Sequence, residues 1–293
     1  MTAVFAGLLT KVGVYAVVRT QTLLFPDDSL RPLLLVAAGL TMLVGIMGAV
    51  AQTDIKRVLS FTLVSHIGYM LMGVAIGGPL ALSGAIYYIA HHITVQTVLF
   101  LLAGLIEYRT GTTNLERLGG LARSAPILSV AFFVPAMNLA GIPPFSGFLG
   151  KVALGRGGIE AGDWLAVTVV VTSVVVSLLT LYAVAKVWNR AFWKPADADA
   201  SQAALDDGRD QWSHGAMHGG GKVTTRTQAT SSWQDLAEQQ RLPLGMALPT
   251  LALVLVSVGL TLVAGPLFEV TDGAARELIE RTPYIEAVLG SSS

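Results

Sequence analysis

The chain has 293 residues, of which 53% are hydrophobic and 13% are charged. Its formal net charge is zero and it contains no cysteine, which excludes a global basic field for nucleic acid, disulfides and thiolate metal sites. The mean hydropathy of +0.63 is typical of a membrane protein.

Seven segments are long and apolar enough to cross a membrane. A span takes about 20 mostly apolar residues, and its backbone must be helical because no water is present to satisfy it. The predicted spans cover residues 3–18, 33–51, 59–78, 81–106, 126–155, 164–188 and 243–265. The predicted fold class is therefore an all-α polytopic membrane bundle. The first segment lacks the flanking features of a signal peptide, so we expect a retained span.

Basic residues in the short connections predict the orientation of the bundle. The connections after the second and fourth spans carry Lys56, Arg57, Arg109, Arg117 and Arg123. The connections on the opposite side carry Arg19 and Arg31. Because cytoplasmic loops are enriched in lysine and arginine, we expect the first set and the N-terminus to lie inside and the C-terminus outside.

The chain divides into four predicted regions, the first a helix bundle over 1–190. Residues 191–241 are polar and predict a flexible cytoplasmic loop, in which His214 and His218 are not expected to bind a metal. The last span follows at 242–265. Residues 266–293 predict an amphipathic tail at the membrane surface. Its apolar stripe consists of Leu278, Ile279, Ile285, Val288 and Leu289.

The fifth segment contains an interruption that predicts a broken helix. In "AMNLAGIPPFSGFLGKVAL", Pro143 and Pro144 remove backbone donors among several glycines. Broken helices at membrane depth are tolerated only against protein or a water-filled cavity, and transporters build their sites from them. Lys151 follows within about two helical turns, so this region is a candidate transport site.

Basic side chains recur inside the other predicted spans. Lys11 lies in the middle of the first, His66 in the third, and His91 and His92 in the fourth. A charge at the centre of a span costs about 2.5–3.5 kcal/mol, so these residues indicate an aqueous pathway or a partner. We expect a proton relay, with a hydrogen-bonded core histidine as the alternative for His66. Adjacent residues lie about 100° apart on a helix, so one of His91 and His92 is expected to lie outside the pathway.

Four motifs, in this order and spacing, resemble a known family. They are "LLTKVGVYAVVR", "AQTDIKRVLSFTLVSHIGYM", "HHITVQTVLFLLAGLIEYRTGTTNLERLGGL" and "NLAGIPPFSGFLGK". They are similar to the proton-pumping, antiporter-like subunits shared by respiratory complex I and the Mrp-type multisubunit cation/proton antiporters. Lysine at position 151 and the tail "TPYIEAVLG" most resemble the D-subunit branch of the Mrp-type antiporters.

The resemblance implies two inverted five-helix repeats, of which this chain would hold the second with one helix on each side. It places Lys11 on the central-axis lysine, His66 and His92 on the two relay histidines, and Lys151 on the terminal basic residue. Gln96 departs from relatives that carry a basic residue at its position, so the relay step there is expected to be water-mediated or absent. His91 and Gln96 are therefore secondary relay candidates. These residues hold no counterpart of the first repeat or of its intramembrane glutamate. We therefore expect a fragment or a misassigned start site, with a stand-alone half-antiporter as the alternative.

The resemblance implies a subunit that exchanges Na⁺ or another monovalent cation for protons in the plasma membrane, together with other subunits and without a cofactor. Two alternatives remain at this stage. The chain is a proton-pumping subunit of NADH-quinone oxidoreductase, or it is a structural membrane subunit that does not conduct. Glu107, at the end of the fourth span, is expected to be an interfacial group rather than a relay member.

Overall fold

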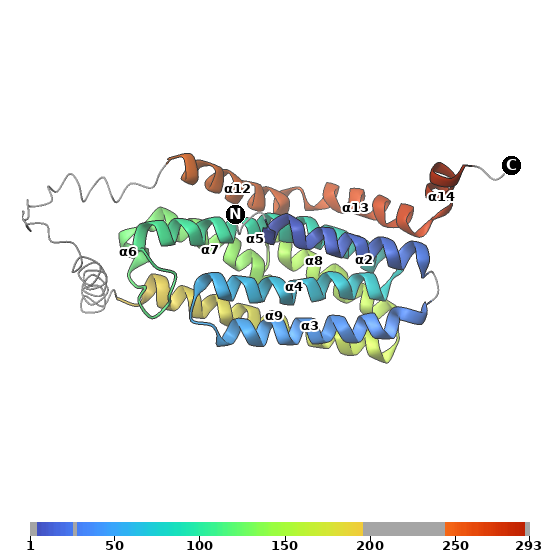
Figure 1. Cartoon of the computed structure of the whole chain (residues 1–293), viewed down its shortest axis with the longest axis horizontal. Helices are drawn as coiled ribbons and strands as arrows, with labels where there is room; N and C mark the ends of the chain where they lie inside the picture. Colours follow the sequence, from blue (N-terminus) through green and yellow to red (C-terminus); the bar gives the residue numbers. More distant parts are fainter. Residues whose placement is uncertain (1–4, 26–27, 196–243, 291–293) are drawn as a thin grey trace, which may run out of the picture.

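The computed structural model describes residues 5–25, 28–195 and 244–290, and these form a bundle of helices along one long axis (Figure 1). In these ranges the one β pairing is an isolated bridge between Asp54 and Asn114. The predicted all-α class is confirmed. The helices are η1 Phe5–Leu9, α2 Thr10–Leu24, η2 Asp28–Leu30, α3 Arg31–Ala51, α4 Ile55–Ile76, α5 Gly78–Thr110, α6 Leu121–Ser124, α7 Pro126–Ala140, α8 Ser146–Glu160, α9 Trp164–Trp188, η3 Asn189–Trp193, α12 Leu244–Leu262, α13 Ala264–Ile279 and α14 Thr282–Leu289.

Five of the described helices are long and apolar enough to cross a membrane, namely α3, α4, α5, α9 with its η3 extension, and α12. The other two predicted spans are built differently. The first consists of η1 and α2, which follow each other without a gap. The interrupted span consists of α7 and α8, with Pro143 and Pro144 in the connection between them.

The central helix of the bundle is α5, which packs against α4, α7, α8, α12 and α13. It has 33 residues and is about 50 Å long. Gly77, which precedes the helix, and Gly78, its first residue, both have positive φ, and Gly111 ends it in the left-handed conformation that favours glycine. Because α5 is covered on several sides, its polar side chains Ser83, His91, His92 and Gln96 are buried.

Helices α12 and α13 follow one another along the same side of the bundle (Figure 1). Helix α13 is held on α5 by a stack of Phe268 on Tyr87, with ring centroids 4.1 Å apart, and by a 3.0 Å hydrogen bond between Thr271 Oγ1 and Ser83 Oγ. The chain after residue 262 therefore continues along α5. The membrane-surface position of the tail stays a prediction; Ile285 and Val288 of α14 are exposed.

Most of the predicted polar loop, including His214 and His218, lies outside the described residues. Its first residues, Ala191–Trp193, belong to η3, where Phe192 is buried and stacks on Trp188 with ring centroids 4.5 Å apart. The helical part of the chain thus extends a few residues beyond 190.

The two predicted sets of basic residues lie at opposite ends of the bundle. At one end, Lys56 forms an ion pair with Glu107. This partner explains how the Glu107 carboxylate is stabilised near the end of α5. At the other end, Arg31 pairs with Asp163 at 2.6 Å. The side of the membrane on which each end lies stays a prediction from the excess of positive charge.

Small residues allow α3 and α4 to approach each other closely. A Cβ added at Gly45 would collide with the backbone nitrogen of Ser65, and one at Gly68 would lie 2.5 Å from Met42 Cγ. Close backbone approach through glycine is a common way to pack helices in a membrane, where lipid offers no hydrophobic drive between them. This contact fixes α4, which carries His66.

We expect Gly45→Ala to lower the free energy of unfolding by about 1–3 kcal/mol, because the added methyl overpacks the α3–α4 interface. The measurement is thermal unfolding of the purified protein in detergent. Gly39→Ala, also in α3, is the matched control, since its Cβ would approach only Val169, at 3.8 Å. Equal melting temperatures for the two variants would contradict this account of the interface.

Candidate functional site

A cluster of buried polar rings lies between α4 and α5. Tyr88 Oη lies 3.0 Å from His66 Nδ1, and the rings of His66 and His92 have centroids 5.0 Å apart. Tyr69 extends the cluster, with its ring centroid 5.6 Å from that of Tyr88. All four side chains are essentially inaccessible to solvent. The structure therefore brings together the two predicted relay histidines.

The break between α7 and α8 creates a place for an ammonium group. Helix α7 ends at Ala140, and Gly141, with φ of 81°, turns the chain away, so the last carbonyls lack partners within the helix. Lys151 Nζ donates to Ala140 O at 3.0 Å, to Leu139 O at 3.4 Å and to Ser177 Oγ at 2.8 Å. The negative end of the α7 dipole also favours a cation here.

Lys151 also contacts the ring cluster. Its Nζ lies 5.0 Å from the centroid of the Tyr69 ring, a distance suited to a cation–π interaction. The Tyr69 hydroxyl in turn donates to Ser173 O at 2.5 Å, in the helix that also supplies Ser177. Lys151 is thereby connected to His66 through the two tyrosine rings.

His91 points to a different set of partners from its neighbour His92. Its Nδ1 lies 3.0 Å from Ser146 Oγ, at the start of α8, and Ser146 Oγ donates to Asn138 Oδ1 at 3.2 Å. The backbone nitrogen of Ser146 donates to Thr261 Oγ1 of α12 at 3.0 Å. His91 thus bonds the start of α8, and its ring also lies 5.4 Å from that of Tyr88, so both adjacent histidines border the ring cluster. Whether one of them lies outside the pathway stays a prediction.

Lys11 lies on α2 and is buried, with 5% of its surface exposed. Its Nζ donates to Thr10 Oγ1 at 3.2 Å. A cleft of about 700 Å³ leads past it. The cleft is lined by Lys11, Tyr15, Val18, Arg19, Ile86, Ile89, Ala274, Glu277, Leu278 and Tyr284. The cleft extends from Lys11 to Arg19, which lies about 12 Å farther along α2 toward one end of the bundle.

Gln96 lies one turn beyond His92 and is fully buried. It donates to Leu59 O at 2.7 Å, while its Oε1 has no protein partner among the described residues. The same holds for His66 Nε2 and for both ring nitrogens of His92. These are the atoms that can exchange a proton or bind water. No group of three His, Asp or Glu residues in the described ranges is placed to hold a metal.

The sequence interpretation did not include Tyr69, Tyr88 and Ser177. The two tyrosines had a usable signal, because Tyr69 follows His66 by three residues and Tyr88 precedes His92 by four, spacings that share a helix face. Ser177 had none, since its role depends on where α9 packs. Ser146 was also missed. It follows the predicted break, but nothing in the sequence indicates that its hydroxyl contacts His91.

The fold and this site define a multi-pass membrane protein with a broken helix and a buried line of ionisable side chains. Residues 1–177 match the family model described as "NADH:quinone oxidoreductase/Mrp antiporter, TM". The chain therefore belongs to this family, which confirms the resemblance drawn from the four motifs.

Named relatives refine the comparison. The chain is 39% identical over 289 residues to the D subunit of the Na⁺/H⁺ antiporter of Alkalihalophilus pseudofirmus, covering 98% of this chain and 51% of that one. A chain in the structure of the Mrp complex from Dietzia sp. matches with a TM-score of 0.80 and 37% identity, covering 99% of this chain and 55% of that one. A chain of respiratory complex I from Thermus thermophilus with bound NADH matches with a TM-score of 0.62 and 30% identity, covering 92% and 50%. The chain thus spans about half the length of these relatives.

We expect Gly141→Ala to destabilise the protein more than Gly162→Ala. Both glycines have positive φ, so each alanine carries a left-handed strain of about 1–2 kcal/mol. At Gly141 the new Cβ would also lie 2.9 Å from Lys151 Cδ and 3.0 Å from its Nζ, whereas at Gly162 the nearest atom is 3.9 Å away. Displacing Lys151 loses hydrogen bonds worth about 1 kcal/mol each. Thermal unfolding of the two variants measures the difference, and equal losses would argue against tight packing around Lys151.

Proposed function

We propose that this chain is a membrane-spanning part of a monovalent cation/proton antiporter subunit, and that it carries protons between Lys11 and Lys151. The observation that carries the proposal is the line of buried contacts from Lys151 through Tyr69 and Tyr88 to His66 and His92. Ionisable side chains at membrane depth are costly and persist where they serve transport.

The chemistry of the line suits stepwise proton transfer. Imidazole can take a proton on one nitrogen and release one from the other, and a tyrosine hydroxyl both donates and accepts. In the proposed path a proton enters through the cleft to Lys11 and moves through a bridging water to His92 and His66. The Tyr88 hydroxyl then accepts the proton from His66 and releases its own, which a second bridging water passes to Lys151. The carbonyls of Leu139 and Ala140 stabilise the ammonium form at the far end.

Charge coupling gives the line a means of control. In the proposed path His66 stands between Lys11 and Lys151. A proton on either lysine therefore changes the proton affinity of the histidine between them, so that transfer at one end influences the other. Gln96, one turn from His92, carries no charge and cannot itself hold a proton in the path. In the proposed path a water bound to its Oε1 passes the proton to His92.

The cation in this proposal is Na⁺ or another monovalent ion. The support is the name of the relative with 39% identity, the D subunit of an Na⁺/H⁺ antiporter. The partners would be further subunits of a membrane complex, as in the Mrp complex from Dietzia sp., in the plasma membrane of the host. Because this chain covers about half the length of those relatives, the proposal concerns the part of the path that lies in these residues.

A proton-pumping subunit of an NADH-quinone oxidoreductase is the second candidate, and the match to complex I from Thermus thermophilus favours it. The same relay would then be driven by electron transfer elsewhere. Deleting the gene and measuring NADH oxidation by host membranes separates the two. Loss of NADH-driven proton pumping, with cation-dependent flux intact, would support the second candidate.

We expect Lys11→Ala and Lys151→Ala, in the assembled complex, to abolish cation-dependent proton flux in everted vesicles, because each removes an end of the relay. Arg156→Ala is the control, since it removes an exposed cation from the helix that carries Lys151. Normal flux with normal expression of both lysine variants would refute these roles and favour the non-conducting structural alternative.

We expect Tyr88→Phe to slow proton flux by about tenfold or more, because the ring still packs but the hydroxyl bonded to His66 Nδ1 is gone. The measurement is the initial rate of cation-induced pH change in the same vesicles. Tyr182→Phe, which removes an exposed hydroxyl on α9, should leave the rate unchanged. Equal rates for the two variants would exclude Tyr88 from the path.

A further inference from the structure

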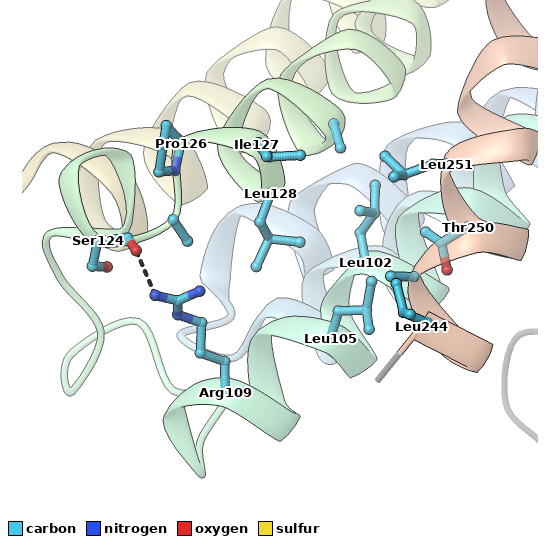
Figure 2. A pocket seen from close by; sticks show the side chains of 13 residues that line it. Leu102, Leu105, Arg109, Ser124, Pro126, Ile127, Leu128, Leu244, Thr250 and Leu251 are labelled. Atoms are coloured by element: carbon cyan, nitrogen blue, oxygen red, sulfur yellow. Dashed lines mark hydrogen bonds between the residues drawn. The ribbon is translucent and has the colours of Figure 1, made fainter. Parts of the chain in front are cut away.

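An apolar groove lies between α5, α7 and α12, away from the buried polar line. Its volume is about 320 Å³, and its wall is formed by Leu102, Leu105, Arg109, Ser124, Ala125, Pro126, Ile127, Leu128, Ala131, Leu244, Ala247, Thr250 and Leu251. Figure 2 shows leucine and isoleucine side chains converging on it from the three helices, with Arg109 at one end.

The groove continues along the seam between α7 and α12. A second cavity, of about 550 Å³, shares Pro126, Ile127, Ala131 and Leu251 with the first. It extends to Val134 on α7 and Leu255 on α12. From Leu244 to Leu255 the helix rises about 16 Å, which is close to half of the ~30 Å hydrocarbon core. The groove therefore has the length of a chain in one membrane leaflet.

The groove has one polar end. Arg109, in the last turn of α5, donates through Nη2 to Ser124 O. It has no carboxylate partner among the described residues, so the other N–H groups of its guanidinium remain for a ligand. The exposed Arg123, beside Ser124, adds positive charge. No acidic residue is among those that line either cavity.

We propose that this groove binds one anionic phospholipid, with an acyl chain along α7 and α12 and its phosphate on Arg109. Apolar walls at membrane depth match a hydrocarbon chain, and a guanidinium at the end of a span matches a phosphate held at the headgroup level. The site is separate from the proton relay, so the proposal does not depend on the proposed function.

Native mass spectrometry of the purified protein, in the membrane complex in which it is made, tests the proposal. The probes are phosphatidylglycerol and phosphatidylcholine in mixed nanodiscs. We expect Arg109→Gln to reduce the preference for phosphatidylglycerol by about fivefold. Arg117→Gln, which removes an exposed charge from the connection after α5, should leave it unchanged. An unchanged preference in Arg109→Gln would overturn the phosphate assignment.

Filling the groove tests the acyl-chain site. Ala247→Phe should release one retained lipid, whereas Leu248→Phe, on the exposed side of α12, should not. If Ala247→Phe detaches a partner subunit and leaves the lipid count unchanged, the groove holds a protein and the proposal fails.

A measurement on the unaltered protein avoids any dependence on variant folding. Phosphatidylglycerol with a diazirine on its acyl chain should label peptides from residues 126–134 and 244–255. Labelling confined to other helices would also overturn the proposal.

Discussion

The capture of the Lys151 ammonium by the end of α7 is the contact on which the candidate site depends. A membrane interior supplies no water to the carbonyls of Leu139 and Ala140, and it supplies none to a cation either. The broken helix satisfies both needs with one side chain, because Lys151 uses three hydrogen bonds on two carbonyls and Ser177. The same contact holds α7, α8 and α9 together beside the tyrosine and histidine rings.

The adjacent histidines of α5 show how one helix serves two purposes. His92 faces the ring cluster with His66, while His91 bonds to Ser146 at the start of α8. The 100° step between neighbours on a helix gives them different hydrogen-bonding surroundings, although the rings of both lie near that of Tyr88. The hydrogen bond of His91 to Ser146 is one of the contacts that position α5 beside the break.

Much of the fold could be predicted because apolar length and glycine–proline breaks are local properties of the sequence. The seven spans and the interruption at Pro143 and Pro144 needed no knowledge of packing, and the four motifs indicated the family. Ser177 and Thr261 could not be predicted, since hydroxyls on long apolar helices look alike until the helices are packed. The packing of α13 along α5 could not be predicted either, because the charged residues of α13 resemble those of a helix at the membrane surface.

Helices α12 and α13 reach both ends of the candidate path. Thr261, near the end of α12, accepts a hydrogen bond from the first residue of the helix that carries Lys151, whereas Glu277 and Leu278 of α13 line the cleft at Lys11. The two helices are separated only by Val263 and follow one side of the bundle (Figure 1). They therefore provide a second physical connection between the broken helix and the mouth of the cleft, one that runs along α12 and α13 and does not include the buried rings.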